Sequence, residues 1–450
     1  MKLNPLFPTR ETLGINTDLY ELTMAAAYFE AGRIADRGTF ELFTRRLPQT
    51  RSFLMAAGLE QALHFVQNVR FTKSTLQYLK QLDLFKSINS AFFDYLRNFH
   101  FSGDIHALPE GTIFFSNEPI LQVTAPIIEA QLLETYLMST LNFQSMVASK
   151  AARICHAGQG KTIVDFGSRR AHGPQAGVLA ARAAFIGGCA GTSNVLAGYE
   201  MGIPVVGTMA HSFVQFFDSE TEAFQHFWDV FGENSTLLVD TYDTLAGVQK
   251  ALDLGKRIQG VRLDSGDLLS LAFKTRELLD QQGRSEVQIV ASGNLNEEKI
   301  HSFVLQNAPI DAYGVGTDLV VSADAPTCDL VYKLVEVIKE GKAQPRIKTS
   351  EGKKTLPYRK QIYRRIGKEG FCGDLLSRSA ERVPQDSSGL VPLLRQYVQK
   401  GHIMADLPDV FQIQEYAQKQ LSLLPPALSL LHSSQEYPVE YSKKLARECI

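Results

Sequence analysis

The feature that most constrains this chain is a series of six short apolar runs, each followed by a helical pattern. The runs are rich in Val, Ile and Leu, as are strands that are buried on both faces. Such strands alternating with amphipathic helices predict a parallel sheet covered by helices. Six units within about 160 residues favour a (β/α) barrel over an open sheet. The runs are TIVDFG (162–167), IPVVGT (203–208), TLLVDT (236–241), GVRLDSG (260–266), VQIVASGN (287–294) and IDAYGVGT (310–317).

Two common nucleotide-binding motifs are missing from this region. No GxGxxG follows the first strand, and the chain contains no GxxxxGK[ST], so a dinucleotide-binding fold and a P-loop are both disfavoured. The net charge is only −2, which leaves no general basic field for nucleic acid or an anionic membrane. Any phosphate binding must therefore come from a local site.

Cysteine usage and the N-terminus favour a reducing cytoplasm. The five cysteines include no CxxC pair, and their odd number argues against a disulfide framework and against structural zinc. The opening MKLNPLFPTRETLG lacks the apolar segment of a secretory signal. Long uncharged stretches such as 183–199 are interrupted by Gly, Ser, Thr and Asn, so we expect no membrane span.

The flanking regions show mixed patterns. Before the series, we expect a helix from about Leu19, a strand in RGTFELFTRRLP (37–48) and a long helical stretch over 127–158. LPEGTIFFSNEPILQVTAP (108–126) predicts a hairpin that turns at Asn117–Pro119. After the series, the basic segment that follows Lys333 predicts a hairpin or loop, and the C-terminus looks helical from Leu407 with a break at Pro425–Pro426.

Polar residues follow each predicted strand, at the end where chemistry collects in a (β/α) barrel. These carboxyl ends meet around one mouth, so we expect a single site. Arginine forks bind phosphate or carboxylate, glycine turns offer backbone N–H groups to phosphate, and aspartates hold Mg²⁺ through water. This composition indicates a phosphorylated substrate with a metal. The residues are Arg169–Arg170, Thr208, His211, Asp240, Arg262, Asp264, Asp267, Ser292–Gly293–Asn294, Gly314 and Gly316–Thr317.

Each of these residues also has a purely structural interpretation. Arg262 and Asp264 share a strand face and could pair with each other. Asp267 could be a helix-start acid, and His211 a cap or a satisfied polar residue. The glycine turns could be tight connections only. Tyr20 and Phe166 could be core aromatics.

Six motifs in order resemble the nicotinate phosphoribosyltransferases, which have the type II phosphoribosyltransferase fold, over essentially the whole chain. The motifs are NTDLYELTMAAAY (16–28), DFGSRRAHGP (165–174), GGCAGTSNVLAG (187–198), GTMAHSF (207–213), VRLDSGDL (261–268) and YGVGTDL (313–319). The resemblance implies an irregular (β/α) barrel with an N-terminal α/β sandwich-like domain that the segments after the barrel complete. We expect domains at 1–130, 131–335 and 336–450, with the last packing back on the first.

The resemblance also implies a reaction. Nicotinate attacks phosphoribosyl pyrophosphate to give nicotinate mononucleotide and pyrophosphate, a step of NAD biosynthesis that is coupled to ATP and Mg²⁺. A transient phosphohistidine, at His211 here, carries the coupling. The fold implies a homodimer with shared sites, in which Tyr20 comes from the neighbouring chain.

Individual roles follow from the same resemblance. Tyr20 and Thr208 contact nicotinate, Phe166 stacks on its ring, and Arg169 and Arg262 hold its carboxylate or the diphosphate. Gly316 and Thr317 take the ribose phosphate. Asp240, Asp264 and Asn294 line the ribose and diphosphate pocket, and Ser212 and Gly293 are expected there too. His211, Arg262 and Asp240 are the expected catalytic residues, and Asp264 and Asp267 the expected Mg²⁺ ligands through water.

The chain departs from the family pattern twice, and rival functions remain. Tyr358 stands where the family usually has glycine after proline, so that turn is expected to differ. Met209 stands where some relatives have histidine. The nearest rival is a nicotinamide phosphoribosyltransferase on the same fold. A sugar-phosphate aldolase or isomerase would want a strand-end Lys or Glu, which is lacking, and a non-catalytic barrel scaffold would need no polar strand ends.

Overall fold

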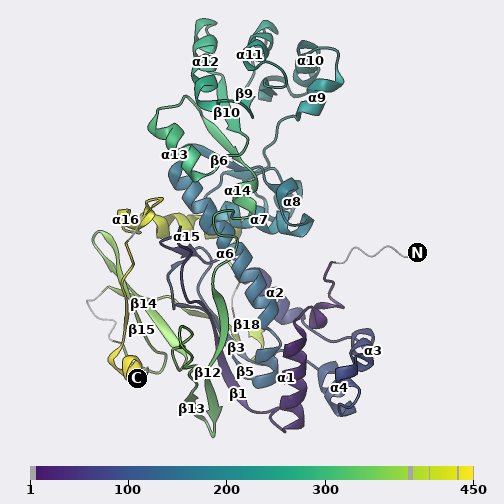
Figure 1. Cartoon of the computed structure of the whole chain (residues 1–450), viewed down its shortest axis with the longest axis vertical. Coiled ribbons are helices and arrows are strands. Elements are labelled where there is room, and N and C mark those ends of the chain that lie inside the picture. The colour runs from purple at the N-terminus through teal and green to yellow at the C-terminus, as the bar shows by residue number, and fades with distance from the viewer. Residues whose placement is uncertain (1–6, 384–388, 405, 433–434, 449–450) are drawn as a thin grey trace. The chain divides into compact units, whose positions relative to one another are not determined.

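The computed structural model describes residues 7–383, 389–404, 406–432 and 435–448. Contacts within the chain divide it into two compact units (Figure 1). Unit 1 comprises Met1–Ser145, Thr327–Pro408 and Lys419–Ile450. Unit 2 comprises Met146–Pro326 and Asp409–Gln418.

Unit 2 contains the predicted parallel sheet. Its strand order is β7-β6-β11-β10-β9-β8, and every pairing is parallel. The strands follow chain order around a ring in which the last strand, β11, pairs with the first, β6. The strands are β6 (Thr162–Asp165), β7 (Gly191–Thr192), β8 (Thr236–Leu238), β9 (Gly260–Leu263), β10 (Gln288–Ser292) and β11 (Ala312–Val315).

The ring is irregular because one predicted strand is almost absent. Within 203–208 only Val205 pairs, through a single parallel bridge to Thr192. Pro204 has no backbone N–H to donate, which shortens any ladder there. In the described residues the ring therefore stays open between this segment and β8. The mixed α/β fold with a parallel sheet and an irregular barrel is confirmed.

Helices follow the strands of unit 2, as the amphipathic patterns predict. Several begin with a side-chain cap: Asp243, Asp267 and Asn296 accept the backbone N–H of Ala246, Ser270 and Lys299. Figure 1 shows α11 and α12 beside β9 and β10. The helices are α6 (Glu134–Ala157, which begins in unit 1), α7 (Pro174–Ile186), α8 (Val195–Met201), α9 (His211–Phe216), α10 (Glu220–Phe231), α11 (Thr244–Asp253), α12 (Leu268–Gln281), α13 (Glu297–Leu305), α14 (Thr317–Val320) and α15 (Val410–Ser422, which ends in unit 1). Short 3₁₀ turns lie at Ser168–Arg170 and Gly232–Asn234.

Unit 1 is built on a seven-stranded sheet of order β13-β12-β1-β5-β3-β17-β18 and a four-stranded sheet of order β16-β14-β15-β19. Its strands are β1 (Arg37–Thr44), β2 (Leu54–Met55), β3 (Asp104–Ala107), β4 (Ile113–Phe114), β5 (Pro119–Pro126), β12 (Leu330–Lys339), β13 (Lys342–Pro345), β14 (Lys360–Gly367), β15 (Gly370–Arg378), β16 (Leu390–Pro392), β17 (Arg395–Gln399), β18 (His402–Ile403) and β19 (Val439–Tyr441). Its helices are α1 (Leu19–Glu30), α2 (Leu59–Asn68), α3 (Lys73–Gln81), α4 (Ser90–Arg97), α5 (Ile127–Gln131), α16 (Pro426–Ser429) and α17 (Lys443–Arg447), with 3₁₀ turns at Leu13–Ile15 and Asp83–Phe85.

Most of the predicted flanking elements are present, but one pairing prediction is wrong. The helix from Leu19, the strand from Arg37 and the hairpin after Lys333 (β12 with β13) all form. The hairpin over 108–126 does not form, because β4 pairs with β2 while β5 pairs with β1 and β3. Both strands are buried: β5 lies inside the seven-stranded sheet, and β4 forms a separate two-stranded sheet with β2.

A buried charged cluster lies inside unit 1. Arg364 is fully buried and donates to Asp374 through Nε (3.0 Å) and Nη2 (2.6 Å). Tyr437 donates to the same carboxylate at 2.9 Å, and a second buried carboxyl, Glu118, lies 4.0 Å from Arg364 Nη2. One buried arginine is thus shared by two buried carboxyl groups.

Among the described helices, none combines the length and the apolar character that crossing a membrane requires.

Candidate active site

In unit 2 the carboxyl ends of the parallel strands surround a cavity of about 750 Å³, which we call the strand-end pocket. Fourteen of the sequence-predicted residues line it: Phe166, Arg169, Arg170, Thr208, His211, Ser212, Arg262, Asp264, Ser292, Gly293, Asn294, Gly314, Gly316 and Thr317. The other lining residues are Ser193, Gly207, Met209 and Ala210. Strand ends from across the series therefore converge on one site.

The wall after β6 is held by the buried carboxylate of Asp165. It accepts the backbone N–H of Gly167 (2.8 Å) and the hydroxyl of Thr192 (2.7 Å). Burial raises the pKa of Asp165, and these two hydrogen bonds oppose that rise. The bonds fix the turn from which Phe166 and Arg169 extend into the pocket.

The Phe166 ring lies where a side chain at Gly314 would otherwise be. A Cβ on Gly314 would lie 2.3 Å from a Phe166 ring carbon, far inside contact distance. The Phe166 backbone N–H donates to Val315 at 2.8 Å, which joins the turn to β11. The aromatic ring is therefore seated against the β11 backbone, with glycine required beneath it.

Arg262 is the most deeply placed cation of the pocket. Its Nη1 donates to the Thr208 hydroxyl, which joins β9 to the segment before α9. Its Nε is buried without a hydrogen-bond partner in the described structure. Burial lowers the pKa of the Arg262 guanidinium, and the Asp264 and Asp240 carboxylates oppose that effect. An unsatisfied buried donor in a cavity wall is a position for a ligand oxygen.

His211 faces two carboxylates instead of capping a helix. Its Nε2 lies 3.7 Å from Asp264 and 4.0 Å from Asp240, and its Nδ1 is 3.1 Å from the Thr241 hydroxyl. Asp264 is itself fixed by a hydrogen bond from Ser292. The imidazole is therefore oriented from both of its nitrogens at the edge of the pocket.

The pocket lining carries more positive than negative charge. Arg169, Arg170 and Arg262 line it, against the single carboxylate of Asp264. Arg169 and Arg170 form no hydrogen bond or ion pair through their guanidinium groups within the described residues. Free guanidinium groups in a concave site suit a phosphate or carboxylate ligand.

The ends of β10 and β11 line the pocket with glycine turns instead of charged side chains. Gly293 has φ +92°, and a Cβ there would lie 1.9 Å from the Asp264 carbonyl oxygen. Asn294 follows it with φ +49°. Gly316 precedes α14, which begins at Thr317. These turns are tight connections and pocket walls at the same time.

Three predicted residues lie outside the pocket lining. Asp240 is buried behind the wall, where Oδ2 accepts from Asp264 N (3.0 Å) and Ser265 Oγ (2.6 Å). Asp267 caps α12 through the backbone N–H of Ser270 at 3.3 Å. Tyr20 lies on α1 in unit 1 and is 45% exposed. Its predicted role at a neighbouring chain's site stays a prediction.

Sequence reasoning missed two neighbours of this site. Thr241, beside His211, immediately follows Asp240, so the polar pair after β8 was the available signal. Ser193 lines the pocket at the end of β7, a two-residue strand too short to give a periodic pattern.

A magnesium ion fits this site only together with substrate. The described residues contain no cluster of three or more His, Cys, Asp or Glu that could hold a metal alone. Asp264 lines the pocket, and the Oδ1 atom of Asp240 is buried without a hydrogen-bond partner in the described structure. Mg²⁺ commonly binds through one or two carboxylates, water and substrate phosphates, so these oxygens are compatible with it.

Three family models match this chain. The nicotinate phosphoribosyltransferase N-terminal domain matches residues 15–142, the nicotinate phosphoribosyltransferase family matches 162–368, and the C-terminal domain matches 387–448. The nicotinate phosphoribosyltransferase of Mycobacterium tuberculosis is 45% identical over 96% of this chain and 92% of its own length. That of Bacillus subtilis is 38% identical, over 96% and 94%.

Solved structures agree. The crystal structure of human nicotinic acid phosphoribosyltransferase superimposes with a TM-score of 0.85 at 32% identity, covering 96% of this chain and 98% of that one. The structure of nicotinate-nucleotide pyrophosphorylase from Pyrococcus furiosus gives a TM-score of 0.76 at 29% identity, with 93% and 98% covered.

Proposed function

This chain belongs to the nicotinate phosphoribosyltransferase family, and on that premise we propose that it joins nicotinate to phosphoribosyl pyrophosphate. The products are nicotinate mononucleotide and pyrophosphate, and ATP is hydrolysed to ADP and phosphate in the coupled step. The observation that carries this proposal is the guanidinium-rich strand-end pocket, in which Arg262 Nε has no hydrogen-bond partner among the residues that the structure describes. The reaction is a step of NAD biosynthesis.

The chemistry needs charge stabilisation more than a base. The pyridine nitrogen attacks C1 of the ribose with its own lone pair, so no proton has to be removed. The bond from C1 to the pyrophosphate oxygen breaks, and negative charge builds on the leaving group. Arg169 and Arg262 bind that charge or the nicotinate carboxylate, and they hold the reacting groups in position. Mg²⁺, when bound, would neutralise part of the diphosphate charge, and Asp264 is the residue that would hold it through water.

The remaining lining residues receive positioning roles. Phe166 offers a ring face to the pyridine, and Thr208 contacts nicotinate while accepting from Arg262. Gly316 and Thr317 bind the ribose phosphate, and Ser212, Gly293 and Asn294 complete the ribose and diphosphate walls. Asp240 acts through its contacts, because it fixes the turn that contains Asp264.

His211 is the proposed phosphoryl acceptor. A neutral imidazole nitrogen is a nucleophile that can attack the γ-phosphorus of ATP, with ADP leaving and the phosphohistidine later cleaved by water. Both ring nitrogens of His211 are within 4.0 Å of a polar side-chain atom, which orients the ring for one attack direction. We propose that the added phosphoryl charge orders nearby pocket residues and tightens phosphoribosyl pyrophosphate binding. Unchanged affinity for that substrate with and without ATP would remove this part of the proposal.

A homodimer is proposed as the working form. The side chains of Val195, Leu196 and Tyr199 on α8 are 72%, 51% and 83% exposed. Val205, which follows α8, is 50% exposed and packs against Gly198 of that helix. An apolar group of this kind on a surface is typical of an interaction site. Tyr20 of one chain would then complete the pocket of the other.

Parallel assays with radiolabelled nicotinate and nicotinamide test the substrate assignment. The guanidinium groups favour a carboxylate, so we expect turnover of nicotinate and little or none of the neutral amide. Faster turnover of nicotinamide would assign the chain to the rival reaction on the same fold.

A further inference from the structure

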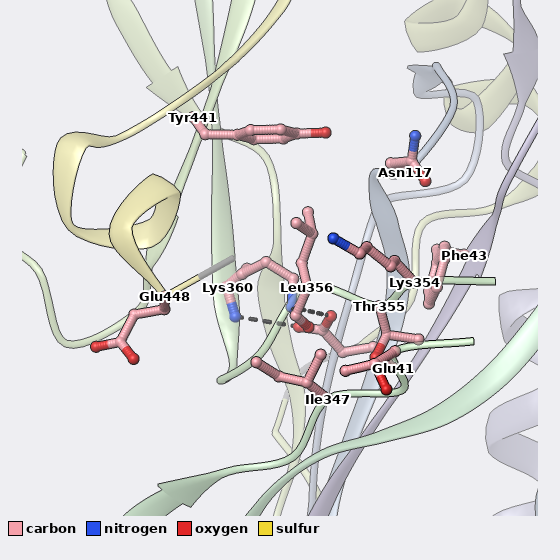
Figure 2. A pocket seen from close by; sticks show the side chains of 11 residues that line it. Glu41, Phe43, Asn117, Ile347, Lys354, Thr355, Leu356, Lys360, Tyr441 and Glu448 are labelled. Carbon is pink, nitrogen blue, oxygen red and sulfur yellow. Dashed lines mark hydrogen bonds and ion pairs between the residues drawn. The ribbon is translucent and has the colours of Figure 1, made fainter. Parts of the chain in front are cut away.

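Unit 1 contains a second cavity, of about 280 Å³, which we call the unit 1 cavity. Figure 2 shows side chains from β1, β14 and β19, from the segments before β5 and after β13, and from Glu448, which follows α17, arranged around it. None of its lining residues belongs to the strand-end pocket, and the proposed reaction uses none of them. They are Glu41, Phe43, Asn117, Ile347, Thr349, Lys354, Thr355, Leu356, Lys360, Tyr441 and Glu448.

The base of the cavity is a saturated ion pair. Glu41 and Lys360 are buried, with Lys360 Nζ 2.6 Å from Glu41 Oε2. The same ammonium donates to the Leu356 and Tyr358 carbonyls at 2.9 and 2.8 Å, which uses all three of its protons. The other Glu41 oxygen accepts from Gln122 and from the Lys360 backbone. All three protons of this ammonium and both oxygens of this carboxylate therefore already have partners within the described residues.

Among the described residues, one charged side chain of the lining has no partner. Glu448 is 3.5 Å from Arg378, so its charge is also neutralised by protein. Lys354 forms no hydrogen bond or ion pair within the described residues. Figure 2 shows its side chain directed into the space between the lining residues. The cavity thus offers one ammonium that is not matched by protein.

The walls around that ammonium are largely apolar. Tyr441 lies across the cavity from Ile347, with Leu356 between them in the view (Figure 2), and Phe43 is buried at the side. A volume of about 280 Å³ is about nine times the ~30 Å³ that a water occupies in the liquid. A ligand of about nine non-hydrogen atoms fits such a space, which is the size of a single ring with a carboxylate.

We propose that the unit 1 cavity binds a small aromatic monocarboxylate, with the carboxylate on Lys354 and the ring between Tyr441 and Leu356. A single unmatched cation selects a monoanion over a polyphosphate, and the apolar walls select a ring over inorganic phosphate. The site is separate from the proposed transfer reaction and does not depend on it.

The test titrates 4-fluorobenzoate against the full-length protein, and fluorine NMR measures its binding. The titrations are done in the Arg262→Ala background, which removes one of the three guanidinium groups of the strand-end pocket. The binding that belongs to the unit 1 cavity is the part that a further Lys354→Ala substitution removes. We expect saturable binding with a Kd of about millimolar, as befits a fragment-sized ligand. Adding Lys354→Ala should weaken that binding by about tenfold or more.

Two controls make the result specific. Lys353→Ala removes the neighbouring lysine, which does not line the cavity, and should leave the affinity unchanged. The uncharged 4-fluorobenzamide should bind the Arg262→Ala protein at least about tenfold more weakly than the carboxylate. The proposal is overturned if the carboxylate does not saturate, if Lys353→Ala weakens it as much as Lys354→Ala, or if the amide binds equally well. Transfer activity of the wild-type protein is measured separately, so either proposal can fail alone.

Discussion

At the scale of single residues, Arg262 is the side chain on which the strand-end pocket depends most. It is held by Thr208, and its Nε is buried without a hydrogen-bond partner among the described residues. We expect Arg262→Ala to lower kcat/KM by about 2–4 kcal/mol, or about 30- to 900-fold, if it stabilises charge in the transition state. Arg257→Ala is the matched control, because that arginine is exposed and its ion pair with the exposed Glu233 is long, at 4.0 Å. Similar losses in both variants would contradict the assignment.

His211 is expected to affect coupling more than transfer. The imidazole lies at the pocket edge beside Asp264, and the pyridine nucleophile needs no base. We therefore predict that His211→Ala abolishes the stimulation by ATP and leaves residual phosphoribosyl transfer. The measurement is nicotinate mononucleotide formation against ATP concentration, together with acid-labile ³²P on the protein. A variant that keeps full ATP-dependent activity would remove the proposed phosphohistidine.

Tyr358 shows what a residue-level rule can miss. Tyrosine does not easily adopt positive φ, yet Tyr358 has φ +64°. Two hydrogen bonds hold the backbone there: the Tyr358 N–H donates to the Val335 carbonyl at 2.9 Å, and the Tyr358 carbonyl accepts from Lys360 Nζ at 2.8 Å. The Arg378 guanidinium also lies 3.8 Å from the centre of its ring. These contacts hold Tyr358 in the left-handed region against the local preference of tyrosine.

At the scale of elements, the approach of β6 to β11 sets the position of the aromatic wall. Gly314→Ala would place a methyl 2.3 Å from the Phe166 ring and push the ring toward the substrate space. We predict a fall in kcat/KM for nicotinate of about 10- to 100-fold. Tyr313→Phe on the same strand is the control, since it removes a buried hydroxyl without a partner in the described structure and should leave activity unchanged. Normal kinetics for Gly314→Ala would show that Phe166 does not position nicotinate.

The elements that the sequence predicts well are those with a strong period of their own. Continuous Val, Ile and Leu runs locate β6, β9, β10 and β11, and their polar ends identify most of the pocket. Elements that depend on long-range pairing are not predictable in this way. The two residues of β7 have no period, and β4 and β5 are each paired with distant strands instead of with one another.

The site prediction is limited in the same way. Sequence position places Asp240 and Asp264 at strand ends, but it cannot tell which carboxylate faces the cavity. Backbone geometry turns Asp240 behind the wall and Asp264 into the pocket. The unpaired Nε of Arg262 also depends on burial by distant segments, which no local pattern encodes.

At the scale of the whole molecule, the buried cluster in unit 1 predicts a pH dependence of stability. Burial, and next the neighbouring Asp374 carboxylate, raise the pKa of Glu118 well above its ordinary value. Folding therefore favours the protonated acid, and its contribution is complete below the unfolded pKa of about 4.3. The contribution is lost as the pH rises toward the folded pKa, by up to about 1.4 kcal/mol per pH unit.

Replacing that acid with a neutral isostere should remove this slope. Between about pH 5 and 8, which lies above the unfolded pKa of Glu, the free energy of unfolding of the wild type should fall as the pH rises. We predict that the free energy of unfolding of Glu118→Gln falls less over the same range. Urea unfolding at several pH values measures it. Glu440→Gln is the control, because that carboxylate is exposed and 3.9 Å from Arg365. Parallel pH curves for wild type and Glu118→Gln would mean that Glu118 is ionised in the folded protein.

Shared active sites can be tested by mixing inactive variants. If Tyr20 completes the pocket of a neighbouring chain, Tyr20→Ala and Arg262→Ala homodimers each have two defective sites. Subunit exchange between equal amounts gives about half heterodimers with one intact site each, so about a quarter of wild-type activity should return. Analytical ultracentrifugation of the same samples measures the oligomeric state. No recovery after demonstrated exchange would place Tyr20 in the pocket of its own chain or in none.

The most direct test of the central claim is the amount of nicotinate mononucleotide formed by the purified wild-type protein from nicotinate and phosphoribosyl pyrophosphate, with ATP and Mg²⁺ and without ATP. We predict product with equimolar pyrophosphate in both cases and a higher rate with ATP. Absence of product under both conditions, from a folded protein, would contradict the claim that the converging strand ends form a phosphoribosyl-transfer site.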